Sequence, residues 1–382
     1  MERHSSSLHI DNAQGTIQQR EIADRLLDWY DVNKRDLPWR RRLGDAYAVW
    51  ISEIMLQQTT VATVIPFYDR WMTAYPTVRD LAAAPLDDVL KMWAGLGYYA
   101  RARNLHKAAQ VVVDRFDGIV PSDPSTIREL PGIGRYTAGA ILSIAYNRNE
   151  PIVDANVIRV LSRLFVIDGD PKTSASTQKR IWDYAAALIP DGRASDFNQA
   201  MMELGALVCD SSTPRCSSCP VESVCAAKRL GDPAAYPQFV KKDVWRSLDD
   251  VAVAVRNGRG EIALAKRPAT ESLWGGLWEL PRTTRVNGED LIDCAARAVR
   301  EGIGAEAVDL RPFGTVNHIV AKRKITLHGF VAGFVGQPSN AFYESVAWES
   351  RVGASKYAMA TPQVRLLEEL AKYEVQGRLE LE

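Results

Sequence analysis

Residues 130–163 constrain the fold of this chain more strongly than any other stretch of its sequence. They open with Leu-Pro-Gly-Ile-Gly, in which Pro131 ends one helix and Gly132 and Gly134 allow a tight turn. We expect a second helix to begin at about Arg135, which leaves its free N–H groups and the positive end of its dipole beside the turn. The pattern therefore predicts a helical hairpin that can bind a phosphate, although a plain hairpin without a ligand is an open alternative.

Two acidic residues stand alone in apolar surroundings. Asp154 interrupts the stretch Ile-Val-Asp-Ala-Asn-Val, and because a buried carboxylate needs a partner, we expect it to be both a helix N-cap and a reactive group. Glu53 lies in the apolar segment 47–56, which predicts a buried helix. Burial should raise the pKa of Glu53 and keep part of it protonated near neutral pH, as a general acid requires. The alternative is a glutamate on the polar edge of the helix, paired with an arginine.

Four cysteines follow one another with the spacing C-x6-C-x2-C-x5-C. Thiols this close in sequence predict a soft metal or two disulfides, and disulfides are disfavoured in a chain without a secretion signal. A zinc ion is the general alternative to an iron–sulfur cluster. The four residues are Cys209, Cys216, Cys219 and Cys225.

The overall composition gives weaker constraints. Lysine plus arginine and aspartate plus glutamate both number 47, so the net charge is zero, which counts mildly against a nucleic-acid binder. Basic residues nevertheless gather in segments 34–42 and 101–107, and each group is either a DNA contact or solvated surface. No run of about 18 apolar residues occurs and the N-terminus lacks an apolar signal core, so we expect a soluble, cytoplasmic protein that spans no membrane.

Three of these features together resemble a known group of enzymes. The hairpin LPGIGRYTAGAI, the segment VDANVIRVLSR and the cysteine spacing are similar to the helix-hairpin-helix DNA glycosylases that carry a 4Fe–4S cluster, and most similar to the MutY family of adenine DNA glycosylases. The resemblance covers residues 20–370 and implies a multidomain protein. We expect a disordered tail at 1–20, an all-α helix-hairpin-helix glycosylase domain at 21–230 with its iron–sulfur cluster loop at 209–225, a linker at 231–246, a C-terminal α+β Nudix-like domain at 247–370 and a tail at 371–382.

The resemblance also implies roles for individual residues. Glu53 would protonate the adenine, and Asp154 would stabilise the positive sugar or trap it covalently, supported by Tyr136 and Asn156. Position 136 is a lysine in endonuclease III enzymes, and a phenol cannot form a Schiff base, so we expect no lyase activity. The implied DNA contacts are Arg35 and Trp39 around the adenine, Gln199 on its edge, Gln58 and Tyr98 as wedges in the duplex, and Leu56, Thr59, Gly132 and Gly134. For Trp39 and Tyr98 interior packing is the open alternative, and for Gln199 an ordinary helix surface.

In the C-terminal third, the sequence pattern changes from mainly helical to mixed strand and helix. Residues 251–255, the pair Asn257-Gly258 and residues 262–265 predict a β-hairpin, followed by a helix at Leu291–Ile303 and strands near 325–335. The region resembles a Nudix domain, but segment 297–304 keeps only Glu301 of the metal-binding glutamates, so we expect binding without hydrolysis. In the resemblance, a loop at 315–318 with Asn317 and His318 contacts 8-oxoguanine, although the family commonly has Phe-Ser-His there.

The predicted function is therefore that of a monofunctional adenine DNA glycosylase of base excision repair. It would flip adenine out of double-stranded DNA and hydrolyse its N-glycosidic bond opposite 8-oxoguanine, and less well opposite guanine. We expect a monomer, nucleoid-associated in a bacterium, with a 4Fe–4S cluster as cofactor. The alternatives are an endonuclease III-like glycosylase for oxidised pyrimidines and a non-catalytic iron–sulfur DNA-binding protein.

Overall fold

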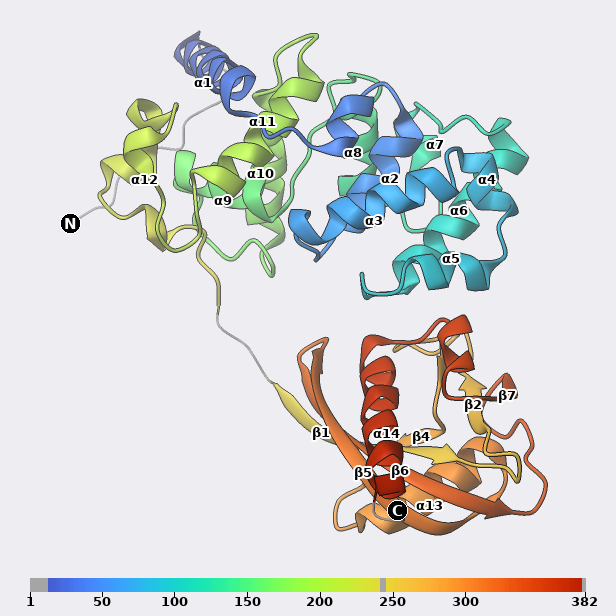
Figure 1. Ribbon diagram of the computed structural model, residues 1–382. Helices are drawn as coiled ribbons and strands as arrows, with labels where there is room; N and C mark the ends of the chain where they lie inside the picture. The colour runs from blue at the N-terminus through green and yellow to red at the C-terminus, as the bar shows by residue number, and fades with distance from the viewer. Residues whose placement is uncertain (1–12, 241–244, 380–382) are drawn as a thin grey trace. The chain divides into compact units, whose positions relative to one another are not determined.

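The computed structural model describes residues 13–240 and 245–379, which form two compact units (Figure 1). The first unit comprises residues up to 83 together with 107–240, and the second comprises residues 84–106 together with 245–379. The division at the C-terminal side falls inside the expected linker at 231–246, whereas segment 84–106 groups with the C-terminal unit.

The first unit is helical. Its elements are α1 (Ala13–Asn33), the 3-10 helix η1 (Pro38–Arg42), α2 (Ala46–Leu56), α3 (Val61–Ala74), α4 (Val78–Ala83), the second part of α6 (Ala100–Phe116), α7 (Pro124–Ile127), α8 (Arg135–Ile144), α9 (Ala155–Leu164), α10 (Ala175–Ala187), α11 (Ala194–Leu207) and α12 (Ala226–Arg229), with the short 3-10 helices η2 (Cys216–Ser218), η3 (Glu222–Val224) and η4 (Pro233–Ala235). α5 (Leu86–Met92) and the start of α6 belong to the second unit.

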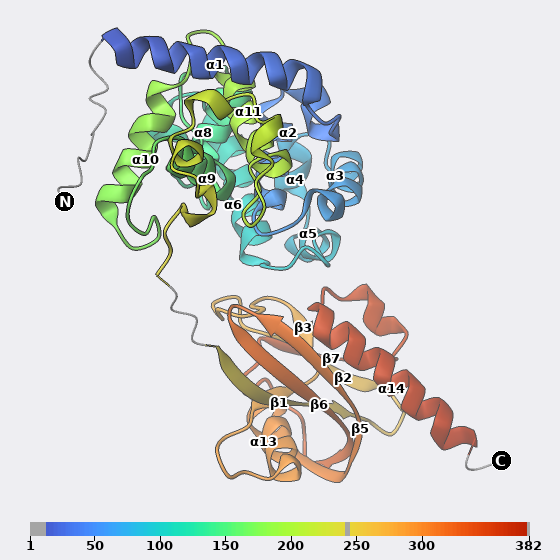
Figure 2. The ribbon, with the colours of Figure 1, turned by 90° about the vertical axis from the view of Figure 1, so that its left-hand side faces the viewer.

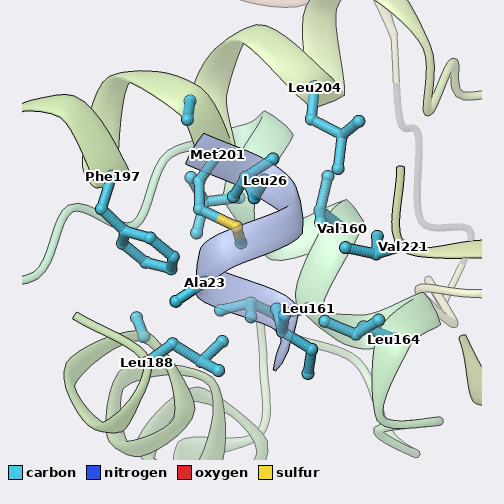
Figure 3. Close-up of a cluster of buried hydrophobic side chains, with 14 of the residues drawn as sticks. Ala23, Leu26, Val160, Leu161, Leu164, Leu188, Phe197, Met201, Leu204 and Val221 are labelled. Carbon is cyan, nitrogen blue, oxygen red and sulfur yellow. The ribbon is translucent and has the colours of Figure 1, made fainter. Parts of the chain in front are cut away.

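One hydrophobic core joins the first helix to elements far along the sequence. Leu26 of α1 packs with Leu161 of α9, with Met201 of α11 and with Val221 and Val224 of the cysteine loop. Figure 3 shows α1 among side chains from α9 and α11, with Leu188 just after α10 and Val221 of the cysteine loop beside them. Burial of this apolar face, worth about 1.5–3 kcal/mol for each large side chain, is what holds α1 in place.

The second unit contains two sheets. The strands are β1 (Arg246–Val255), β2 (Ile262–Lys266), β3 (Trp278–Glu279), β4 (Arg282–Thr284), β5 (Glu306–Val320), β6 (Arg323–Val335) and β7 (Ser345–Glu349); the helices are α13 (Leu291–Ile303), η5 (Gly353–Lys356) and α14 (Thr361–Leu379). The larger sheet has the order β4-β1-β6-β5, with β1 and β6 parallel, and the smaller has the order β3-β2-β7.

The sequence of β1 is a continuous apolar run because both faces of the strand are buried. Val251 and Val253 pack in a core with α13, whereas Ala252 and Ala254 pack in a core with α14. The two helices cover opposite faces of the larger sheet (Figure 2). Because both faces are buried, neither set of alternating side chains is polar.

Several expected elements are confirmed. The predicted helix 47–56 is α2, the second helix of the hairpin begins at Arg135 as α8, and the predicted helix Leu291–Ile303 is α13 with the same bounds. The strand expected near 325–335 is β6.

Two expectations for the second unit are wrong. The turn at Asn257 forms, but β1 and β2 share only the single bridge between Arg256 and Ile262 and then enter different sheets. Each strand is buried on both faces and pairs with other neighbours, so no hairpin ladder is built. The expected loop at 315–318 is also wrong, because these residues lie in β5 and pair with β6.

The tails also differ from the expectation. α1 begins at Ala13, so residues 13–20 are helical rather than disordered, because the helix extends from its anchored part at Ile22–Tyr30. Residues 371–379 belong to α14, where Glu374 pairs with Arg256 and Arg351. Residues 1–12, 241–244 and 380–382 of the expected tails and linker lie outside the described residues. Along the described ranges, no helix is both long enough and apolar enough to cross a membrane.

Candidate active site

A cavity of about 220 Å³ lies among η1, α2, α8, α11 and the start of α9. It is several times larger than the ~30 Å³ share of one water molecule. Its wall brings together nine residues that the sequence analysis singled out: Glu53, Asp154, Tyr136, Asn156, Arg35, Trp39, Leu56, Thr59 and Gln199. Residues from five separate elements therefore meet at one hollow.

Glu53 is buried in this cavity wall. Its side chain lies on α2 and is 4% exposed, and the hydroxyl of Tyr136 on α8 donates a hydrogen bond to its Oε2. Burial raises the pKa of Glu53 from 4.5 to about 7, and the neighbouring charge of Asp154 adds to the increase. The Tyr136 hydrogen bond and the charge of Arg40 act in the opposite direction. The expected burial and raised pKa are confirmed, and the polar-edge alternative is excluded.

Asp154 caps α9 as expected. Its Oδ1 accepts from the backbone N–H of Val157 at 2.7 Å, and its Oδ2 accepts from Nδ2 of Asn156 at 2.9 Å. Burial raises the pKa of Asp154, while these hydrogen bonds favour the carboxylate and limit the increase. The direct support to Asp154 therefore comes from Asn156. The Tyr136 hydroxyl instead bonds to Glu53, which differs from the role that the resemblance implied.

Two glycines allow Asp154 and Asn156 to approach the cavity. A Cβ on Gly139 of α8 would lie 2.3 Å from the carbonyl oxygen of Pro151, just ahead of Asp154. A Cβ on Gly205 of α11 would lie 2.5 Å from Cβ of Asn156. A larger residue at Gly139 would push the segment before α9 away from α8, and one at Gly205 would push the start of α9 away from α11.

An ion-pair network that the sequence did not reveal forms one wall of the cavity. Glu203 on α11 is 1% exposed and binds both Arg35 and Arg40. Burial alone would raise the pKa of Glu203, but hydrogen bonds from the two arginines outweigh it and lower the pKa to about 2. The available signal was a charged residue four positions after Gln199 in an apolar helix, and therefore on the same face.

The remaining cavity residues differ in their surroundings. Trp39 is buried and packs edge-on against Tyr68, so it is a core residue that also faces the hollow. Gln199 is 3% exposed, which excludes an ordinary surface position. Gln58 does not line the cavity; it is exposed in the turn after α2 with a φ of 58°. Its role as a wedge stays a prediction.

The hairpin has the expected backbone. Gly132 has a φ of 78°, which favours glycine, and Gly134 is the N-cap of α8. No side chain of the described residues caps that helix, so its first N–H groups remain available to a ligand. Both glycines are exposed.

Three expected DNA contacts belong to the second unit. Tyr98 is half-exposed with a φ of 47°, and the guanidinium of Arg101 lies 5.7 Å from its ring centre. Asn317 is exposed on β5, whereas neither ring nitrogen of His318 has a hydrogen-bond partner among the described residues. Burial lowers the pKa of His318, so its neutral form is favoured. Their contacts to DNA stay predictions.

The four cysteines line a second cavity, together with Arg163 and Lys228. All four are free thiols, and Nη1 of Arg163 donates to Sγ of Cys209 at 3.3 Å. Across residues 13–240 and 245–379, no three Cys, His, Asp or Glu side chains come close enough to hold a single metal ion. Four thiols that line one hollow are the donor type that zinc and iron–sulfur groups both use.

Hydrogen bonds connect this cysteine loop to α9. Arg159 donates from Nε to the carbonyl oxygen of Cys209 at 2.7 Å and from Nη2 to Oδ1 of Asn156 at 2.9 Å. Arg163 donates to the carbonyl oxygens of Asp210 and Ser211. The loop therefore braces the helix that Asp154 caps.

Two domain families match the chain. Residues 51–186 match the HhH-GPD superfamily of base excision DNA repair proteins, and residues 251–369 match the NUDIX domain. The first match contains Glu53, Tyr136 and Asp154. A helical glycosylase fold followed by a Nudix fold confirms the expected multidomain architecture.

Individual proteins agree with these matches. The adenine DNA glycosylase of Rattus norvegicus is 53% identical over 215 residues, which cover 54% of this chain and 42% of that protein. The adenine DNA glycosylase of Buchnera aphidicola subsp. Acyrthosiphon pisum is 45% identical over 259 residues, which cover 67% of this chain and 73% of that protein. The solved structure of a thermostable thymine-DNA glycosylase is 30% identical with a TM-score of 0.52, and the match covers 56% of this chain and 98% of that one.

The extent of these matches differs among relatives. The chain spans about two fifths of the length of the rat and human proteins and about three quarters of the Buchnera protein. With 45% identity over most of the Buchnera protein, the chain belongs to the family of adenine DNA glycosylases.

Proposed function

We propose that this protein is a monofunctional adenine DNA glycosylase that removes adenine mispaired with 8-oxoguanine, and less well with guanine, from double-stranded DNA. The observation that carries the proposal is the shared cavity of Glu53 and Asp154, in which burial raises the pKa of Glu53 to about 7. A carboxyl group with that pKa is about half protonated at neutral pH and can act as a general acid. We expect the enzyme to act as a monomer, nucleoid-associated in the bacterial cell.

The reaction begins when the adenine leaves the base stack. A duplex hides the glycosidic bond, so the nucleotide must flip into the cavity, at a cost of roughly a few kcal/mol. Backbone N–H groups at Gly132 and Gly134 would bind a phosphate, and Gln58 and Tyr98 would fill the space in the duplex. These contacts would offset the cost of flipping.

Inside the cavity, Glu53 donates its proton to N7 of adenine. The C–N bond then breaks with its electrons moving to the base, which leaves as neutral adenine. The positive charge that develops on the sugar is stabilised by Asp154, which Asn156 and the start of α9 hold in place. A water molecule adds to C1′ and releases a proton, which restores the acid. Two carboxyl groups in opposite protonation states follow the logic of glycoside hydrolysis.

Cys209, Cys216, Cys219 and Cys225 would hold a 4Fe–4S cluster. Burial raises the pKa of the Cys219 thiol, and the positive charge of bound iron would favour its thiolate form. Such a cluster contributes folding energy and a redox-active group. The cysteines and Arg163 fix the loop against α9, and no step of the glycosylase reaction passes through it.

The Nudix-like domain would recognise the oxidised base. In α13, Glu301 pairs with Arg297, and Arg297 also binds Glu289. These partners leave no cluster of free carboxylates for a hard divalent cation. Asn317 and His318 on β5 are the proposed contacts to 8-oxoguanine, so the domain would bind without hydrolysing.

The test is excision from duplexes with adenine opposite 8-oxoguanine, G, C or T, with abasic sites opened by alkali. We expect cleavage in the first two only, and none with Glu53→Gln. Activity of Glu53→Gln near the wild-type rate would refute Glu53 as the acid. Excision of oxidised pyrimidines, or trapping of the protein on DNA by borohydride, would favour an endonuclease III-like enzyme. Full activity after loss of Asp154 would remove its assigned role.

A further inference from the structure

A buried carboxylate at the cavity wall has no part in the reaction proposed above. Glu203 accepts five hydrogen bonds at 2.7–3.1 Å, from the backbone N, Nε and Nη2 of Arg35 and from Nη1 and Nη2 of Arg40. A carboxylate offers about four acceptor positions. The two arginines therefore saturate Glu203, which has no position left to bind a base directly.

Arg40, which Glu203 holds in place, also forms a hydrogen bond with Gln199. Nε of Arg40 donates to Oε1 of Gln199 at 3.2 Å, and Nε2 of Gln199 donates to the carbonyl oxygen of Ser195 at 3.2 Å. Since a guanidinium can only donate, the oxygen of the amide must face Arg40. Gln199 is 3% exposed, so turning its amide over would cost both hydrogen bonds inside the protein.

We propose that Glu203 is a positioning residue that holds Arg40 and, through Arg40, fixes the orientation of the Gln199 amide at the cavity wall. The cavity then presents one fixed pattern of donor and acceptor to the edge of the purine. A site built in this way rejects a base that lacks the matching group, because buried polar atoms would be left unpaired. This inference rests on the proposed function and names the residues that set its base specificity.

The same network acts on the general acid. The groups that face Glu53 are Tyr136 from α8, Asp154 at the start of α9 and Arg40 from η1. The charge of Arg40 lowers the pKa of Glu53, and Glu203 compensates part of that charge. Without Glu203, the charge of Arg40 would lower the pKa of Glu53 further. A lower pKa slows the reaction on the alkaline limb, because fewer molecules carry the proton on Glu53.

The experiment compares wild type, Glu203→Gln and Glu203→Asp in single-turnover excision at saturating enzyme, from pH 6 to 9. The duplexes carry adenine, or purine without the 6-amino group, opposite 8-oxoguanine. For Glu203→Gln we expect the rate ratio of adenine to purine to fall about tenfold, the worth of one hydrogen bond, and the alkaline limb to move to lower pH. Glu203→Asp keeps the charge, so it should restore in part both the adenine-to-purine rate ratio and the position of the alkaline limb.

The outcomes separate the two proposals. A wild-type protein that does not excise adenine would refute the proposed function. Wild-type activity together with an unchanged ratio and an unchanged alkaline limb in Glu203→Gln would overturn the role of Glu203.

Glu279 offers a matched control in the second unit. It is 1% exposed and also binds two arginines, Arg267 and Arg282. Glu279→Gln should lower stability in the same way but leave the adenine-to-purine ratio unchanged. If Glu203→Gln does not fold, Arg40→Lys decides instead: it keeps a charge beside Glu203 but cannot also reach Gln199, so the ratio should fall. A wild-type ratio in Arg40→Lys would overturn the proposal.

Discussion

Replacing Glu53 with glutamine should stabilise the protein while it removes the proposed general acid. Burial raises the pKa of Glu53 from 4.5 in the unfolded chain to about 7 in the folded one. A shift of about 2.5 units corresponds to about 3 kcal/mol of unfolding free energy. Glutamine has no such cost, and its side-chain oxygen can still accept the hydrogen bond from Tyr136.

The pH window of this effect follows from proton binding. Between pH 4.5 and about 7 the folded chain binds more protons at Glu53 than the unfolded chain does. The wild-type protein therefore loses stability as the pH rises through this window, and the loss is complete above it. Glu53→Gln should exceed the wild type by less than about 1 kcal/mol at pH 5 and by about 3 kcal/mol at pH 8.

Urea unfolding at pH 5 and pH 8, monitored by the circular dichroism of the helices, measures this difference. Glu129→Gln is a suitable control, because Glu129 is 56% exposed and forms a surface pair with Arg115; its stability should change little with pH relative to wild type. If the gain in Glu53→Gln is the same at both pH values, the reasoning about burial fails. It also fails if the wild type is more stable than Glu53→Gln at pH 8.

Four further predictions follow from the site. Asp154→Asn should abolish excision yet lower the unfolding free energy by no more than about 1 kcal/mol, because asparagine also caps helices; single-turnover assays and urea unfolding measure the two. Tyr136→Phe removes a hydrogen bond that lowers the pKa of Glu53, so the alkaline limb of excision should move to higher pH, and a move to lower pH would contradict the geometry. Cys209→Ser should reduce the visible absorption of the cluster and the urea midpoint of the helical unit, whereas a colourless wild type would exclude the cluster. His318→Ala should weaken the preference for 8-oxoguanine over guanine in competition binding, with the single-turnover rate opposite guanine unchanged.

Local sequence signals were sufficient to predict much of the fold and the surroundings of the two carboxyl groups, Glu53 and Asp154. The apolar periodicity of α2 predicted the burial of Glu53, and the start of a helix after an isolated acid predicted that Asp154 is an N-cap. Both signals depend on residues within one helix, so a single sequence carries them.

Features that depend on distant partners could not be predicted. Glu203 meets Arg35 168 positions earlier in the chain, and no local pattern indicates that pair. Likewise, β1 pairs with β6 across about 80 residues, so the tight turn at Asn257 suggested the wrong neighbour. The segment with Asn317 and His318 was expected to be a loop only from the resemblance to the family, and its pairing with β6 depends on residues that follow later in the chain.

The shared core of α1 and the cysteine loop also determines when the chain can fold during synthesis. Leu26 leaves the ribosome early, but its partner Val221 follows about 200 residues later. At 5–20 residues per second, this delay lasts roughly 10 to 40 s. During that time the apolar face of α1 lacks part of its native core, and a nascent chain that stops before the cysteines would be a target for chaperones and proteases.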